Sequence, residues 1–81
     1  MTRDEVMDLV REHLVTELEL SPDEIKPEAR FKEDFDADSL DLYELVMELE
    51  DRYGISLSEK EASEIVTVGD AVDFVLAKAG A

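Results

Sequence analysis

The chain has 81 residues, of which 44% are hydrophobic, and its 23 acidic residues outnumber its 8 basic residues to give a formal net charge of −15. This length and apolar content predict a single small folded domain over residues 1–81 rather than a disordered acidic tail. The charge argues against nucleic acids and anionic membrane surfaces, both of which require basic patches. It favours protein partners with basic docking patches, because opposite charges accelerate encounter.

Cysteine is absent, so disulfides and cysteine-ligated zinc sites are excluded. The first residues already include Arg3, Asp4 and Glu5, unlike the start of a secretory signal. No apolar run approaches the roughly 20 residues that a membrane-spanning helix needs. We therefore expect a cytoplasmic, monomeric protein that does not insert into membranes.

The first predicted element is a helix. Thr2 and Glu5 have the spacing of a capping box, with Thr2 as the N-cap and Glu5 reaching back to it. Apolar residues then recur at helical spacing, which predicts a helix over Arg3–Leu18 with one buried face. That face comprises Val6, Leu9, Val10, Leu14 and Leu18.

Residues 19–38 are predicted to form a long ordered loop. Ser21 is suited to cap a single turn, which Pro27 then stops. Loops beyond about 12–15 residues are uncommon unless they are functional. Phe31 and Phe35 are expected to anchor this one on the core.

Two further helices are predicted directly after the loop. One covers Ser39–Tyr53 and ends at Gly54, a residue that readily takes the left-handed conformation. A second capping box, at Ser58 and Glu61, starts a short helix.

The last helix is predicted to start at residues 67–70 and to end before Gly80. No segment has the sustained alternation of a β-strand. The sequence therefore predicts an all-α bundle of three longer helices and one short helix, with the long ordered loop between helices one and two.

The helix predicted over Ser39–Tyr53 has apolar residues on two opposite faces. Leu40, Tyr43 and Met47 form one of them, beside acidic residues such as Glu44. Packing within the bundle requires only one apolar face, so this second face is predicted to dock partner proteins, and Met suits a surface that accepts several of them. The alternative is that these are isolated exposed apolar residues without a role. The face expected in the core comprises Leu42, Leu45, Val46, Leu49 and Tyr53.

Ser39 follows Asp38 at the predicted start of this helix. A serine at that place is either an ordinary N-cap or a site of modification. A hydrolase nucleophile is not indicated, because the chain lacks a Gly-x-Ser-x-Gly turn and its only histidine, His13, is expected at the boundary or surface of the first helix. The sequence thus predicts a non-catalytic protein.

A dedicated metal site is not predicted either. Asp34, Asp36 and Asp38 have the opening spacing of a calcium-binding loop. Ser39 stands where that loop needs glycine, and Leu45 where it needs its bidentate glutamate. Only weak binding of divalent cations by the dense negative charge is expected.

Two segments carry a resemblance to a known family. Residues 36–50, which include Asp38-Ser39-Leu40, resemble the phosphopantetheine attachment region of acyl carrier proteins, and residues 67–71 resemble the start of that family's last helix. The resemblance covers nearly the whole chain. It implies that a phosphopantetheinyl transferase attaches 4′-phosphopantetheine from coenzyme A to Ser39, with Asp38 helping to place the metal of the transferase. The thiol of that arm then holds acyl groups as thioesters.

The resemblance also implies roles for other residues. Asp36 stands where family members often have glycine, and Tyr43 is bulkier than the residue frequent at its position. The positions that match the family's partner-recognition helix are Leu40, Tyr43, Glu44, Met47, Glu50 and Asp51. The positions that match the lining of its acyl pocket are Val46, Leu49, Leu57, Ala62 and Ile65.

Three hypotheses for function follow from the sequence. The favoured one is a carrier that delivers acyl groups to fatty-acid synthesis enzymes. The second is a carrier for a specialised pathway such as polyketide synthesis, with the same chemistry at Ser39. The third, from a different class, is an acidic interaction or cation-binding module without a prosthetic group.

Overall fold

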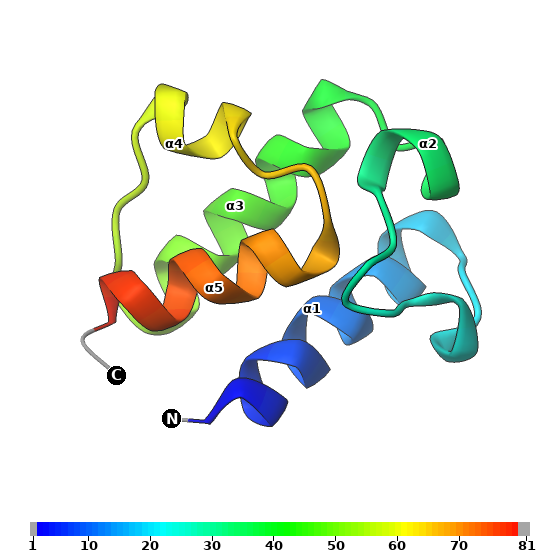
Figure 1. The fold of residues 1–81 in the computed structure, drawn as a ribbon, viewed down its shortest axis with the longest axis horizontal. Coiled ribbons are helices and arrows are strands. Elements are labelled where there is room, and N and C mark those ends of the chain that lie inside the picture. The colour runs from blue at the N-terminus through cyan, green and yellow to red at the C-terminus, as the bar shows by residue number, and fades with distance from the viewer. Residues whose placement is uncertain (1, 80–81) are drawn as a thin grey trace.

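The computed structural model describes residues 2–79, which form a bundle of helices (Figure 1). Within that range there is no strand, only one isolated antiparallel bridge between Arg30 and Thr67, and no helix is long and apolar enough to cross a membrane. The elements in chain order are α1 (Arg3–Leu18), the 3₁₀ turn η1 (Pro22–Glu24), α2 (Phe31–Phe35), α3 (Ser39–Tyr53), α4 (Glu59–Ser63) and α5 (Val68–Lys78).

The predicted all-α class and the bounds of the first two long helices are confirmed. Thr2 caps α1 by accepting a hydrogen bond from the Glu5 backbone N–H at 3.2 Å, and Gly54 ends α3 in the left-handed conformation at φ 64°. The predicted capping box of α4 is present, whereas at α1 only the Thr2 half of the predicted box is formed. The last helix ends at Lys78, before Gly80 as predicted, and Gly80 itself lies outside the described residues.

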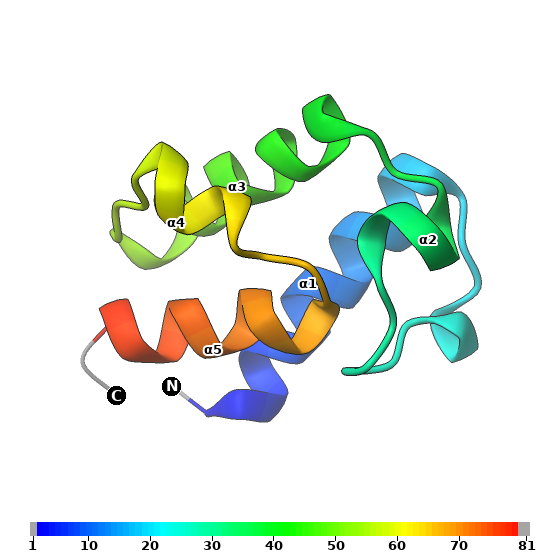
Figure 2. The same cartoon turned by 45° about the horizontal axis from the view of Figure 1, so that its top comes forward.

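The three long helices surround one core. Figures 1 and 2 show α5 alongside α1, with α3 above α5 and α4 at the side of the bundle away from η1. The apolar face predicted for α1 lies in this core, with Leu18 at its edge, and the core face of α3 is buried at Leu45, Val46 and Leu49. Leu42 and Tyr53 are half-buried and pack against the cluster.

The predicted loop between the first two long helices is ordered and contains two short elements. One is the single turn η1, and the other is α2, which the sequence did not predict because five residues are too few for a helical period. Phe31 and Phe35 at the two ends of α2 are buried, and their rings meet edge to face with centroids 6.2 Å apart. They anchor the loop as expected.

Backbone contacts fasten this loop to the start of α5. The Phe31 N–H donates to the Val66 carbonyl at 3.0 Å, and the Val68 N–H donates to the Ala29 carbonyl at 2.9 Å. The Gly69 N–H donates to the Pro27 carbonyl at 2.8 Å, and a Cβ atom at Gly69 would lie only 3.0 Å from that carbonyl oxygen. The absence of a side chain at residue 69 therefore permits the close approach.

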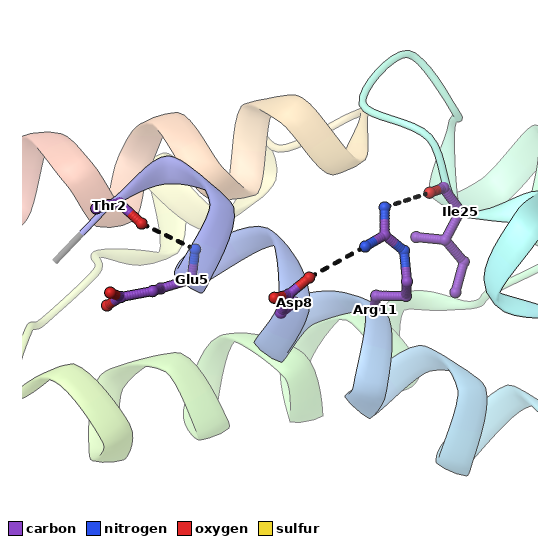
Figure 3. Close-up of polar contacts among 5 residues, drawn as sticks. All are labelled: Thr2, Glu5, Asp8, Arg11 and Ile25. Atoms are coloured by element: carbon purple, nitrogen blue, oxygen red, sulfur yellow. Dashed lines mark hydrogen bonds and ion pairs between the residues drawn. The ribbon is translucent and has the colours of Figure 1, made fainter.

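An earlier part of the loop, at Ile25, is held against α1 by Arg11. Its guanidinium donates to the Asp8 carboxylate at 3.2 Å and to the Ile25 carbonyl at 3.3 Å, as Figure 3 shows. The Ile25 side chain is buried, so the polar contact lies beside an apolar one. Together with the contacts to α5, this fixes both ends of the segment that leads to α2.

Candidate functional site around Ser39

Ser39 is the first residue of α3, but it is not the N-cap. Asp38 caps the helix: its carboxylate accepts from the Asp41 N–H at 2.9 Å, and the Asp41 carboxylate accepts from the Asp38 N–H at 3.2 Å. The interpretation of Ser39 as an ordinary capping residue is therefore wrong. Ser39 is exposed, and its hydroxyl does not cap the backbone N–H groups at the start of α3.

The position of Ser39 is fixed by the turn that precedes it. Asp36 ends α2 with φ 53°, in the left-handed region that glycine adopts more easily. Acyl carrier proteins often have glycine at this position, and this chain makes the turn with an aspartate. Ala37 is then buried and donates its N–H to the Phe31 carbonyl at 3.0 Å. The segment before Ser39 is thereby tied to α2.

A cavity of about 340 Å³ opens beside Ser39, between α2, α3 and the segment that joins α4 to α5. Among the residues proposed for an acyl pocket, Val46, Ala62 and Ile65 line it. Leu49, which lies in the core, and Leu57 do not line it. The sequence did not single out Phe31, Leu42 and Val66 as lining residues.

The second apolar face of α3 is exposed. The exposed fractions of Leu40, Tyr43 and Met47 are 63%, 56% and 49%. Tyr43 also lines the cavity, so the face and the cavity are continuous. Val66, 52% exposed, extends the apolar surface on the far side of the cavity. The only sequence signal for Val66 was an apolar residue immediately before the N-cap Thr67.

The acidic residues assigned to partner recognition divide into two groups. Glu44 and Asp51 are exposed. Glu50 is half-buried, and its carboxylate accepts a hydrogen bond from the Leu57 backbone N–H at 2.9 Å. Glu50 therefore already has a partner within the chain, where it holds the connection between α3 and α4.

The remaining walls of the cavity are held by charged contacts. The Lys78 ammonium donates to the Glu61 carboxylate at 2.7 Å, and this hydrogen bond lowers the pKa of Glu61 below its ordinary value. At the start of α5 the Asp70 carboxylate accepts from the Thr67 and Val66 backbone N–H groups, both at 3.0 Å. The Thr67 bond is the main cause of a lowered pKa at Asp70. Glu61 thus joins α4 to α5, and Asp70 fixes the turn that carries Val66.

Comparison with known proteins gives a consistent result. Residues 8–75 match the family model described as a phosphopantetheine attachment site. An acyl carrier protein of Rubrobacter xylanophilus is 45% identical over 76 residues, covering 94% of each chain, and one from Sulfurovum sp. is 47% identical over 70 residues, covering 86% of this chain and 93% of the relative. A solved acyl carrier protein from Enterococcus faecalis is 36% identical and superposes with a TM-score of 0.83 over 96% of this chain and 99% of that one.

The helical bundle is the fold of a solved acyl carrier protein, and most of the chain matches a phosphopantetheine attachment domain. The chain belongs to the acyl carrier protein family, and the family model that it matches is the phosphopantetheine attachment domain. Proteins of this kind are carriers rather than catalysts.

Proposed function

We propose that Ser39 carries a 4′-phosphopantetheine arm and that the protein delivers acyl groups on it to the enzymes of fatty-acid synthesis. The observation that carries this proposal is the exposed Ser39 hydroxyl, which leaves helix capping to Asp38 and borders an apolar cavity. A modified side chain must be reachable by the modifying enzyme, and Ser39 meets that requirement.

The attachment is a transfer from coenzyme A catalysed by a phosphopantetheinyl transferase. The Ser39 oxygen attacks the pyrophosphate, a new phosphodiester bond forms, and adenosine 3′,5′-bisphosphate leaves with the electrons of the broken P–O bond. The hydroxyl proton passes to a base of the transferase. Asp38 is proposed to help place the metal of the transferase. When bound, the arm supplies a thiol, which this chain lacks because it has no cysteine.

The residues around Ser39 fit such an arm. The cavity has a volume of about 340 Å³ and an apolar lining that includes Leu42, Val46 and Ile65, which suits the hydrocarbon part of an acyl group. The exposed face of Leu40, Tyr43 and Met47, with Glu44 and Asp51 beside it, is proposed to dock acyl-processing enzymes with basic patches. We propose further that residues 1–81 act as a single carrier domain, cytoplasmic and monomeric.

Intact-mass measurement tests the attachment. Incubation of the purified protein with coenzyme A, Mg²⁺ and a broad-specificity transferase is expected to add the mass of one phosphopantetheine. Ser39→Ala is expected to add none, while Ser63→Ala, which removes another exposed hydroxyl bordering the cavity, is expected to be modified like the wild type. An unmodified wild type would favour an acidic interaction or cation-binding module instead.

The pathway is tested separately. Acyl groups found on the protein isolated from its own cells are expected to be the intermediates of fatty-acid elongation. Acyl groups of a specialised pathway, such as polyketide intermediates, would overturn the assignment to fatty-acid synthesis and leave the chemistry at Ser39 unchanged.

A further inference from the structure

The cavity beside Ser39 has one charged flank. Most of its lining is apolar, but the start of α2 contributes Arg30, Lys32 and Glu33. These residues face the same cavity as Ser39, although the nearest of them is six positions earlier in the chain. The cavity is therefore not simply a site for hydrocarbon.

Of the two basic residues on this flank, only Arg30 forms an ion pair within the described residues. The Arg30 guanidinium pairs with the Glu33 carboxylate at 2.6 Å, so these two charges offset each other. Lys32 has no ion pair within residues 2–79 and is exposed. Within residues 2–79, Lys26 and Lys60 also lack an ion pair, but neither of them lines this cavity. The basic residues that do form ion pairs are Arg3, Arg11, Arg30, Arg52 and Lys78.

An unmatched positive charge at this place matters because the domain has a net charge of −15. The field of such a domain opposes the approach of any anionic group to its surface. A lysine ammonium offers three hydrogen-bond donors on a flexible stem, so it can follow an anionic ligand that moves. Lys32 therefore offsets the repulsion locally, at the cavity that Ser39 borders.

We propose that Lys32 is a specificity-determining residue, whose ammonium binds an anionic group of the arm or of its cargo at the cavity beside Ser39. This inference rests on the proposed attachment of the arm. Two groups could supply such an anion, and both carry a single negative charge shared between oxygen atoms. One is the phosphodiester that joins the arm to Ser39, and the other is a carboxylate at the free end of a dicarboxylic acyl group.

The phosphodiester is tested by ³¹P NMR of the arm-loaded protein. The control variant is Lys60→Gln, because Lys60 is exposed, lacks an ion pair within residues 2–79 and does not line the cavity. If the phosphodiester is the ligand, its resonance shifts in Lys32→Gln and not in Lys60→Gln. Raising the salt concentration from about 0.01 M to about 0.1 M then moves the wild-type resonance toward that of Lys32→Gln, since the Debye length falls from about 30 Å to about 10 Å.

The acyl carboxylate is tested by loading the arm with a glutaryl or a pentanoyl group, which have the same chain length and differ in the terminal carboxylate. If that carboxylate is the ligand, Lys32→Gln lowers the melting temperature of the glutaryl form, relative to the pentanoyl form, by a few degrees, the scale of one exposed charge pair. Lys60→Gln leaves the difference between the two forms as in the wild type.

The two comparisons also say which source is correct. A ³¹P shift alone assigns the phosphodiester, and a change in the melting difference alone assigns the acyl carboxylate. If Lys32→Gln behaves like Lys60→Gln in both experiments, the proposal is overturned and Lys32 is an ordinary solvated lysine. A wild type that takes up no arm would overturn the proposed function as well, and its mass spectrum reveals this before either comparison.

Discussion

Lys78 and Glu61 join the end of the last helix to the wall of the cavity, with 2.7 Å between the ammonium nitrogen and a carboxylate oxygen. The contact matters because none of the residues of α4, Glu59–Ser63, is fully buried. Most of the stability of a helix in a protein comes from packing of its apolar face. That packing is weak for α4, which has no fully buried residue. A charged contact to α5 therefore has a larger share in holding α4 than it would have in a buried helix.

Replacing Lys78 is expected to loosen α4 without unfolding the bundle. In Lys78→Gln the backbone amides of α4 are expected to exchange with solvent a few-fold faster, while those of α1 keep the wild-type rate. Hydrogen exchange measured by NMR checks this. The control is Arg3→Gln, which removes another ion pair of the last helix, with Asp73, and does not touch α4. Equal exchange of α4 in both variants would contradict a specific role for the Lys78–Glu61 contact.

The lowered pKa values of Glu61 and Asp70 predict a pH dependence with a definite sign. A carboxyl group whose pKa is lower in the folded chain than in the unfolded chain stabilises the fold fully above the unfolded value, about 4. That contribution is lost as the pH falls through the lower folded value. We expect the difference in melting temperature between wild type and Asp70→Asn to be constant from pH 7 to pH 5 and to shrink below about pH 4.

Comparison with a variant separates this effect from the general loss of negative charge in acid, because both proteins share the remaining acidic residues. A melting difference that stays constant down to about pH 3 would show that the charge of Asp70 does not stabilise the start of α5.

Asp36 is expected to be less favourable than glycine in the turn before Ser39. Its φ of 53° is in the left-handed region, where a side chain is disfavoured by about 1–2 kcal/mol. Glycine loses more conformational freedom on folding, by about 0.5–1 kcal/mol. We therefore expect Asp36→Gly to raise the free energy of unfolding by up to about 1 kcal/mol, measured by urea denaturation.

Two further substitutions test the cause. Asp36→Ala removes the charge but keeps a Cβ atom, so it is expected to be less stable than Asp36→Gly. Glu19→Gly relieves the same conformation, at φ 54°, after α1 and is expected to stabilise in the same direction. If Asp36→Ala and Asp36→Gly are equally stable, charge rather than backbone conformation is responsible.

The exposed face of α3 is expected to determine how the protein meets its partner enzymes. Glu44→Lys is expected to slow association and to make it less dependent on salt, because it removes part of the attraction to a basic patch. Met47→Ala is expected mainly to speed dissociation, because it truncates an apolar anchor. Stopped-flow or surface-based kinetics with an acyl-processing enzyme measure both rates.

The control for charge is Glu12→Lys, an equally acidic and exposed position on α1, away from this face. It should leave both rates near those of the wild type. If Glu12→Lys slows association as much as Glu44→Lys, the partner responds to the overall charge, and the face of Leu40, Tyr43 and Met47 is not a specific docking surface.

The sequence by itself determined most of the helix boundaries, because those signals are local. The cap at Thr2, the capping box of Ser58 with Glu61 and the stop at Gly54 each depend on residues within one helical turn. The two faces of α3 follow from helical spacing alone, so the exposure of Leu40 and the burial of Leu45 agree with the prediction.

Tertiary structure decided what surrounds Ser39, because the cavity brings together side chains from distant parts of the chain. Leu49 is on the same face of α3 as the lining residue Val46, but it lies in the core and does not line the cavity. Phe31 and Val66 are brought to the cavity by backbone hydrogen bonds between the loop and the start of α5. The hydrogen bond of Glu50 to the Leu57 N–H likewise depends on how the chain turns after α3. Periodicity assigns a residue to a face of its own helix, whereas the packing of separate elements determines what that face meets.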